Sequence, residues 1–347
     1  MSRIGNLRRL VCSESSLLIS DPINIRYLCG FTGSFGFLLI NPDEAILLTD
    51  SRYDIQSRDE TTGVSIYLGR DLIDFVKNNC ATKKLLVEGN HLSITQFNKL
   101  SSALDLLIEA SEPIVEKLRV VKDDVEIGHI ESACAISVAA LTEISQTNPR
   151  GLSERQLAIK LERLMIDGGA EAIAFESIVA SGSNSAIPHH QPGNRIIAEG
   201  DLLKIDFGAQ YAGYKSDCTR TFIVGLPSAF HLDLYSAVRE AQYVGRQAVR
   251  QDAACSDIDS AVRQSLQLHE FGRSFQHGLG HGVGLAIHED PFFGAKNNTR
   301  LASGTVVTIE PGLYVEDRGG VRIEDTIVVT DDGYRNLTDF PYELISL

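Results

Sequence analysis

Apolar and polar positions in the first third of the chain predict strands and helices in turn. Ala45–Thr49 and Lys84–Glu88 are short apolar runs with the length of buried strands. Residues 92–106 instead carry apolar positions at helical spacing. The first third of the chain is therefore expected to fold as an α/β domain.

Three glycines in this part, Gly30, Gly33 and Gly36, lie where a phosphate-binding loop could be sought. Dinucleotide-binding loops have the spacing G-x-G-x-x-G and lead directly into a helix. Here the spacing is G-x-x-G-x-x-G, and no helix is predicted to follow it. We interpret the segment as a turn between strands.

A long amphipathic helix is predicted after residues 115–123, the stretch in which we place the domain break. Asp123 and Asp124 stand at its start, where the helix dipole favours negative charge. A second helix opens with a capping box at Ser153-Glu-Arg-Gln156 and closes at two glycines. The apolar stripe of the first helix consists of Ile127, Ile130, Cys134, Val138, Leu141 and Ile144.

Two later segments repeat one pattern of apolar strands, acids and turns. Each has an apolar strand, an acid, a glycine two residues on, a turn, and then acid-x-Thr before another apolar strand. The copies read LLKIDFG followed by DCT, and TVVTIEPG followed by EDT. This pattern indicates a duplicated β-hairpin, and a pseudo-twofold axis would bring four acids to one centre. The acids are Asp206, Asp217, Glu310 and Glu324.

Four carboxylates at one centre would repel each other strongly unless protons or cations relieved the charge. Two divalent metal ions would do so. A further ligand is predicted at His281 in the segment HGLGHGVG, where glycines let the backbone pack closely and leave the imidazole accessible. Asp206 alone would be an ordinary strand-end acid. Such separate explanations do not account for a duplicated acid pattern and a glycine-walled histidine in one chain.

Composition narrows the class of partner. The 347 residues suit two domains, which we place at residues 1–118 and 119–347. The net charge of −14 argues against nucleic acid as a main partner, because phosphate binding needs clustered Lys and Arg. Six cysteines form no C-x-x-C pair and are interpreted as free thiols. Without a signal-peptide pattern or an apolar run of roughly 20 residues, we expect a cytoplasmic protein with no membrane partner.

At these motifs the chain resembles the M24 pita-bread metallopeptidase family, which includes aminopeptidase P, prolidase and methionine aminopeptidase. The N-terminal part resembles the creatinase/prolidase N-terminal domain through NIRYLCGFTGS and TDSRY. The resemblance implies an α/β N-terminal domain and an α+β pita-bread domain with a curved, mostly antiparallel sheet. The matching C-terminal motifs are Pro188-His189, Asp206-Phe-Gly208, Asp217-Cys-Thr219, His277-Gly-Leu-Gly-His281, His288-Glu289-Asp290-Pro291, Glu310-Pro311-Gly312 and Arg322-Ile-Glu324.

The resemblance also implies roles at matching positions. It implies two divalent metals, with manganese expected and cobalt, zinc or iron as alternatives. Glu310 would in addition carry a proton from the attacking water to the leaving nitrogen. His190 could take the place of His189, but the spacing to Gly200 favours His189. The implied metal ligands are Asp206, Asp217, His281, Glu310 and Glu324; the substrate-binding residues are His189, His277 and His288, of which His189 and His288 are also catalytic; Arg322 and Thr219 would orient ligand carboxylates.

Within the family, the extra domain at residues 1–118 favours the proline-specific branch, since methionine aminopeptidases usually lack it. Short proline-containing peptides are then the expected substrates and a homodimer the expected assembly. We favour an Xaa-Pro aminopeptidase over an Xaa-Pro dipeptidase (prolidase). A dipeptidase must anchor a free carboxylate, normally with Arg. Phe292 stands where some small prolidases have that Arg, although Arg273, Arg318 or an Arg of a partner subunit could replace it.

Two alternatives come from other functional classes. The same fold occurs in non-catalytic peptide-binding modules and in creatinase-type amidinohydrolases. Both kinds of relative would be expected to have lost metal ligands, whereas all five ligand positions are filled here.

Overall fold

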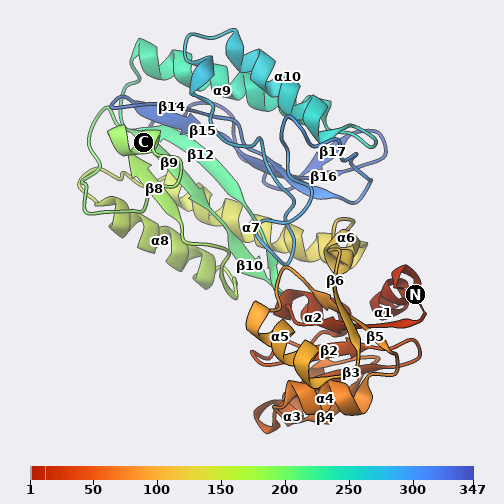
Figure 1. Cartoon of the computed structure of the whole chain (residues 1–347). Helices are drawn as coiled ribbons and strands as arrows, with labels where there is room; N and C mark the ends of the chain where they lie inside the picture. The colour runs from red at the N-terminus through yellow and green to blue at the C-terminus, as the bar shows by residue number, and fades with distance from the viewer. Residues whose placement is uncertain (1, 12) are drawn as a thin grey trace. The chain divides into compact units, whose positions relative to one another are not determined.

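The computed structural model describes residues 2–11 and 13–347. The chain divides into two compact units (Figure 1). The first unit ends at Arg119 and the second is Val120–Leu347. Cys12, one of the six predicted free thiols, lies outside the described residues, and the other five cysteines are free.

A six-stranded sheet with helices forms the first unit, so the predicted α/β character is confirmed. The strand order is β4-β3-β2-β1-β5-β6. The pairs β1–β2 and β2–β3 are antiparallel, and β3–β4, β1–β5 and β5–β6 are parallel. The strands are β1 (Ser15–Ile19), β2 (Phe37–Ile40), β3 (Ala45–Thr49), β4 (Ser65–Leu68), β5 (Lys84–Glu88) and β6 (Leu107–Ser111). The helices are α1 (Arg3–Leu10), α2 (Pro22–Cys29), η1 (Ser51–Tyr53), α3 (Asp54–Glu60), α4 (Leu72–Asn79), α5 (Ile94–Ala103) and α6 (Ile114–Arg119).

The predicted strands at β3 and β5 are confirmed, and the helix predicted over residues 92–106 is the shorter α5. The prediction that the three glycines form a turn between strands is wrong. They connect helix α2 to strand β2, and Gly30 ends α2 with a left-handed backbone, φ 91°. The missed signal was at the start of α2, where Asp21 caps the helix and Pro22 occupies its first turn.

The second unit contains the two predicted hairpins between pairs of helices (Figure 1). All ladders between its strands are antiparallel, in four small sheets. The strands are β7 (Ala172–Ile173), β8 (Ile178–Ser181), β9 (Leu202–Phe207), β10 (Ala209–Tyr211), β11 (Tyr214–Lys215), β12 (Cys218–Ile223), β13 (Val306–Ile309), β14 (Gly312–Val315), β15 (Gly319–Arg322), β16 (Asp325–Val329) and β17 (Tyr334–Asn336). The helices are α7 (Asp124–Ser145), α8 (Glu154–Asp167), η2 (Gly182–Ala186), α9 (Ala229–Ala248), α10 (Cys255–Gln267) and η3 (Gly272–Ser274).

The two hairpins differ in register. In the first, β9 and β10 pair with β12 and β11, and Thr219 lies opposite Asp206. In the second, β13 and β14 pair with β16 and β15, and Thr326 lies opposite Thr308, two residues before Glu310. The two threonines are equivalent in the repeated sequence, so one copy is shifted by two residues against the other. The two hairpins therefore repeat one sequence pattern, but their strands pair in different registers.

Two apolar cores hold the helices to the strands. The predicted pita-bread fold of the second unit is confirmed. Figure 1 shows α7 and α8 on one side of the strands and α9 and α10 on the other. The first core joins α7 and α8 to β9 and β12 and includes Leu141, Leu157, Leu161, Ile205 and Phe222. The second joins α9 and α10 to the second hairpin and includes Leu234, Val238, Val262, Ile309 and Ile327.

Helix α7 is long and apolar enough to cross a membrane when judged by length and composition alone. In the structure it packs against the first hairpin. Tyr214 donates a hydrogen bond to Glu126 at 2.8 Å, and the hydroxyls of Ser137 and Ser216 are 2.7 Å apart. The predicted apolar stripe is buried at Ile130, Cys134, Leu141 and Ile144 and half-buried at Ile127 and Val138. These contacts identify α7 as a core helix of this unit.

The predicted capping box of α8 is present and gives a stability test. Ser153 accepts a hydrogen bond from the Gln156 amide, and the Gln156 side chain accepts one from the Ser153 amide. Ser153→Ala is expected to lower the free energy of unfolding by about 1 kcal/mol, because an amide at the helix start loses its partner. Urea unfolding measures this. The control Ser132→Ala, inside α7, should change stability by no more than about 0.5 kcal/mol, and an equal loss in both variants would contradict the capping argument.

Candidate metal centre

Close backbone packing fixes the predicted metal ligand His281. Its amide donates to the Thr308 hydroxyl at 3.0 Å, and its carbonyl accepts from the Thr308 amide at 2.8 Å. A side chain at Gly280 would collide with the Thr308 carbonyl, and one at Gly282 with the Asp290 carbonyl. The glycines are therefore needed for the close approach, as the sequence indicated. Nδ1 of His281 lies 3.1 Å from the Gly282 carbonyl, which leaves Nε2 free to face the acids.

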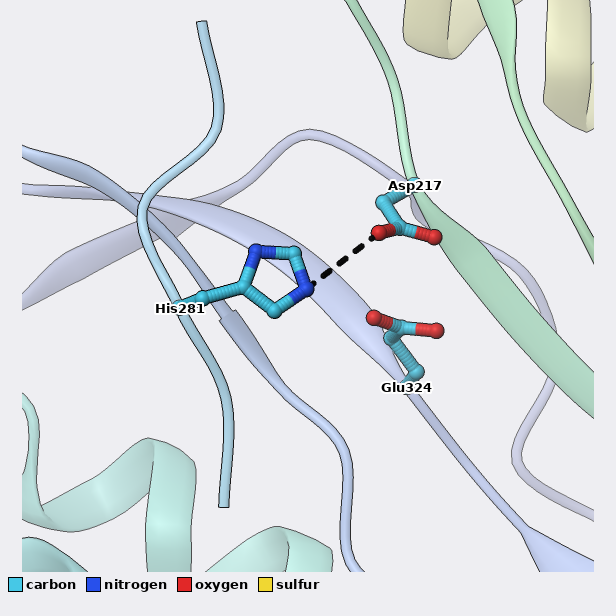
Figure 2. Close-up of side chains that lie close together, drawn as sticks. All are labelled: Asp217, His281 and Glu324. Atoms are coloured by element: carbon cyan, nitrogen blue, oxygen red, sulfur yellow. Dashed lines mark ion pairs between the residues drawn. The ribbon is translucent and has the colours of Figure 1, made fainter. Parts of the chain in front are cut away.

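The predicted acids converge on this imidazole. Asp217 and Glu324, which immediately precede β12 and β16, point toward His281 (Figure 2). Nε2 of His281 lies 3.6 Å from Oδ2 of Asp217 and 3.4 Å from Oε1 of Glu310. One ligand atom each from Asp217, His281 and Glu324 fall within 4.8 Å of one another. Asp206 lines the same cavity, so the hairpins bring all four acids to one place.

Two neighbouring side chains hold the carboxylates in place. Thr219 donates a hydrogen bond to Oε2 of Glu324 at 2.6 Å, and Nε of Arg322 donates to the Thr219 hydroxyl at 3.1 Å. The Arg322 guanidinium also forms an ion pair with Oδ2 of Asp206. The other oxygen of Asp206 is buried and has no hydrogen-bond partner among the described residues. A buried carboxylate oxygen that accepts no hydrogen bond is expected where a cation binds, because the cation takes the place of the donor.

Burial and mutual repulsion favour protonated carboxyls in the cluster. Burial raises the pKa of Asp217 well above its ordinary range, and the charges of Glu324, Asp206 and Glu310 raise it further. Burial and the same repulsion raise the pKa of Glu324, while Arg322 opposes the shift. Burial raises the pKa of Glu310 to about 8. Burial lowers the pKa of His281 to about 4, so its imidazole is neutral at pH 7, as a metal ligand must be.

These donors fit divalent metal ions. Carboxylate oxygens with one imidazole suit several first-row divalent ions, and cations would replace the protons that repulsion otherwise demands. Metal ligation would fall to the five clustered residues, Asp206, Asp217, His281, Glu310 and Glu324.

The three predicted substrate-binding histidines surround the same cavity of about 1030 Å³. The His288 ring lies 4.4 Å from the His281 ring, centre to centre. Burial lowers the pKa of His288, and the nearby charge of His189 adds to that shift. Burial, together with the charge of Arg322, lowers the pKa of His277 to about 4.

Several groups at the cavity were not found from sequence. The Tyr314 hydroxyl lies 2.9 Å from Nε2 of His277 and accepts from Arg322 at 2.8 Å, which connects that histidine to the carboxylate cluster. The fully buried Lys204 donates to the carbonyls of Ile187 and Pro188. One signal for Lys204 was available, a lone lysine within an apolar strand. Tyr314 had none, because its partner His277 lies 37 residues away in sequence.

The arginines proposed as carboxylate anchors lie elsewhere. Arg318 stacks on the Phe230 ring at 3.7 Å, and neither Arg318 nor Arg273 lines the cavity. The cavity instead has Phe292 on its wall, 48% exposed, and the exposed side chain of Arg155 at its rim.

A carboxylate-rich pocket built from two antiparallel hairpins defines a metallopeptidase of the pita-bread class, and sequence comparison gives the same class. The model of metallopeptidase family M24 matches residues 128–331, and the chain belongs to this family. The creatinase/prolidase N-terminal domain matches residues 3–121. Membership implies divalent metal ions, in agreement with the buried cluster of Asp217, His281 and Glu324.

Several relatives and solved structures match this protein over nearly its whole length. An Xaa-Pro dipeptidase of Pyrococcus furiosus is 35% identical over 96% of both chains. Among solved structures, an Xaa-Pro dipeptidase from Bacillus anthracis has a TM-score of 0.96 at 36% identity, with 99% of both chains covered. An X-Pro aminopeptidase from Thermotoga maritima has a TM-score of 0.92 at 35% identity, covering 100% of both.

Protonation of the cluster gives a pH prediction for the metal-free protein. Glu310 keeps a proton up to a pKa of about 8 in the folded state and ionises near 4.5 when unfolded. The histidines with lowered pKa are neutral in the folded state and only partly protonated at pH 6.5 when unfolded, so the several buried carboxyls dominate. Folded stability in EDTA should therefore fall as pH rises from 6.5 to 8. Urea unfolding at the two pH values measures this.

Metal binding should remove the same protons. Calorimetric titration with Mn²⁺ at pH 7, in two buffers of different ionisation enthalpy, is expected to show release of about one proton or more per chain. Glu310→Gln should release fewer protons. The account is wrong if stability in EDTA rises over this pH window, or if the metal binds without proton release.

Proposed function

We propose that this protein is a two-metal peptidase that removes the N-terminal residue preceding proline from short peptides, an Xaa-Pro aminopeptidase. The observation that carries the proposal is the convergence of Asp217, His281, Glu310 and Glu324 in a cavity that four further histidines, His189, His190, His277 and His288, also line. Relatives whose names specify the Xaa-Pro bond cover almost the entire chain.

The cluster suggests how the roles are divided. Asp217 and Glu324 would be shared between two metals, as the family resemblance implies; they approach His281 from different hairpins. Asp206 would complete one site and Glu310 and His281 the other. Arg322 and Thr219 would keep the carboxylates oriented through the bonds already described. Residues 119–347 would then form the catalytic domain and residues 1–118 an accessory domain.

Bound divalent metals would acidify a water molecule and polarise the scissile carbonyl. The protein's own groups must move the proton and steady the developing charge. Glu310 is suited to take up a proton and pass it to the proline nitrogen, since its carboxylate lines the cavity and lies 3.4 Å from Nε2 of His281. His189 and His288 would donate hydrogen bonds to the developing oxyanion, and His277 would contact the substrate.

The wall of the cavity favours peptides longer than two residues. Phe292 presents an apolar ring 6.4 Å from the His281 ring, and an apolar surface there does not bind a free carboxylate. Xaa-Pro dipeptidase activity is the second candidate. It is favoured by Arg155, whose exposed guanidinium at the cavity rim could anchor a carboxylate, and by relatives that carry this name.

The proposal includes manganese as the resident ion, a homodimer as the assembly and the cytoplasm as the location. Oxygen-rich ligation with one imidazole supports manganese. The five described cysteines are free thiols, which supports a reducing compartment.

Activity of the purified protein tests the main proposal. With Mn²⁺, Xaa-Pro-Yaa tripeptides should be cleaved and Xaa-Ala-Yaa tripeptides spared, and EDTA should abolish cleavage. Asp217→Ala is expected to abolish turnover because it removes a shared ligand. Glu310→Gln should lower kcat by about 10²–10⁴-fold because it removes the proton carrier. The exposed control Asp331→Ala should be unchanged. Wild-type activity in either ligand variant would refute these roles.

Length preference follows from the cavity wall. Wild-type protein should cleave Xaa-Pro-Yaa with higher kcat/KM than Xaa-Pro, and Phe292→Arg should lower KM for Xaa-Pro about tenfold by supplying a charged hydrogen-bond donor. The measurement is KM for Xaa-Pro-Yaa and for Xaa-Pro. Arg155→Gln, which removes the arginine at the cavity rim, is measured beside Phe292→Arg. A large rise in the dipeptide KM in Arg155→Gln, with efficient dipeptide cleavage by wild type, would instead establish the dipeptidase.

A further inference from the structure

The carboxylate of Glu154, at the first position of α8, is fully buried and collects donors from one segment. Oε1 accepts from the Ser181 amide and hydroxyl, both at 2.8 Å, and from the Asn184 side chain at 3.0 Å. Oε2 lies 2.8 Å from Nε2 of His190 and accepts from the Gly193 amide at 3.2 Å. Every one of these donors lies within residues 181–193.

The same segment contains His189, and its other side is bound to two buried basic side chains. Lys204 donates to the carbonyls of Ile187 at 2.7 Å and Pro188 at 3.3 Å, and Arg322 donates to that of Pro188 at 3.3 Å. The residues just before His189 are thus attached to buried basic side chains, and those just after it to a buried carboxylate. His189 itself is exposed toward the cavity.

The histidine next in sequence has a different environment. The His190 side chain is 14% exposed, and its Nε2 is directed to Glu154. Burial acts to raise the pKa of Glu154, but the hydrogen bonds from His190, Asn184 and Ser181 outweigh it and lower that pKa. The carboxylate is therefore ionised at neutral pH and binds His190 through a charged acceptor, which is stronger than a neutral one.

We propose that Glu154 is a positioning residue that, through His190 and residues 181–193, holds His189 in the orientation needed to contact the substrate. The inference rests on the proposed function for its catalytic consequence. Glu154 lies outside the metal cluster and does not line the cavity, so it acts on the reaction only through this segment. Displacing a contact group by about 1 Å can cost up to about 100-fold in rate.

The test is Glu154→Gln, which keeps the side-chain size and removes the charge. We expect kcat for Xaa-Pro-Yaa to fall by about 10- to 100-fold with KM and bound metal little changed. In a His189→Ala background the same substitution should cause no further loss, because the group that Glu154 positions is absent. A merely structural role would lower kcat by the same factor in both backgrounds.

A matched control and a second variant keep the test decisive. Glu240→Gln alters an exposed carboxylate that lies 3.4 Å from the half-buried His269, away from the cavity, and should leave kcat unchanged. Should Glu154→Gln fail to fold, His190→Gln removes a single donor of the network and is expected to show the same dependence on His189. An unchanged kcat, or equal losses with and without His189, would overturn the proposal.

A measurement without substrate separates this inference from the proposed function. In the metal-free protein, amide hydrogen exchange should quicken in residues 181–193 of Glu154→Gln and remain as in wild type elsewhere in the second unit. Unaltered exchange in that segment would overturn the positioning role. An inactive wild-type protein with the expected exchange pattern would instead count against the proposed function alone.

Discussion

Repulsion between buried carboxylates is the constraint on which the second unit depends. Asp206, Asp217, Glu310 and Glu324 face one cavity, where water screens their charges poorly. Arg322 offsets part of that repulsion through its ion pair with Asp206. The remainder must be met by protons or by cations, so the fold creates a demand for positive charge. The carboxylates repel one another when no cation is bound, and an ion of higher charge relieves more of this repulsion. The site therefore favours multivalent ions.

The two hairpins meet this constraint differently because their registers differ. In the first, Asp206 lies within strand β9 opposite Thr219, and its carboxylate binds Arg322 of the other hairpin. In the second, Glu310 lies just beyond the end of β13 and faces His281 instead. A shift of two residues keeps a side chain on the same face of a strand while moving it along the strand axis. The duplicated pattern therefore yields four acids on one face that are not equivalent in their surroundings.

Features governed by neighbouring residues were predictable from the sequence, and features governed by distant residues were not. The capping box at Ser153 and the strand at Ala45–Thr49 depend on local chemistry, and both are present. The glycines beside His281 indicated close packing but not its partner, because Thr308 lies 27 residues away. The acids could be grouped because a repeat reports on symmetry as well as on local structure. The contacts of Tyr314 with His277, and of Glu154 with His190, span 37 and 36 residues and left no spacing signal. The glycine segment was misinterpreted because Gly30 ends a helix whose start had not been recognised.

A difference in structural support separates the proposed metal ligands from the histidines that we propose contact the substrate. Asp206 belongs to a strand, and Asp217, Glu310 and Glu324 adjoin strand ends, so backbone ladders fix them. His189 lies in an irregular segment, where no ladder determines the direction of a side chain. Its orientation must come from side-chain bonds to the flanking backbone, and buried charged groups make the strongest of these. The network around Glu154 therefore supplies for this segment the rigidity that pairing between strands supplies for the acids.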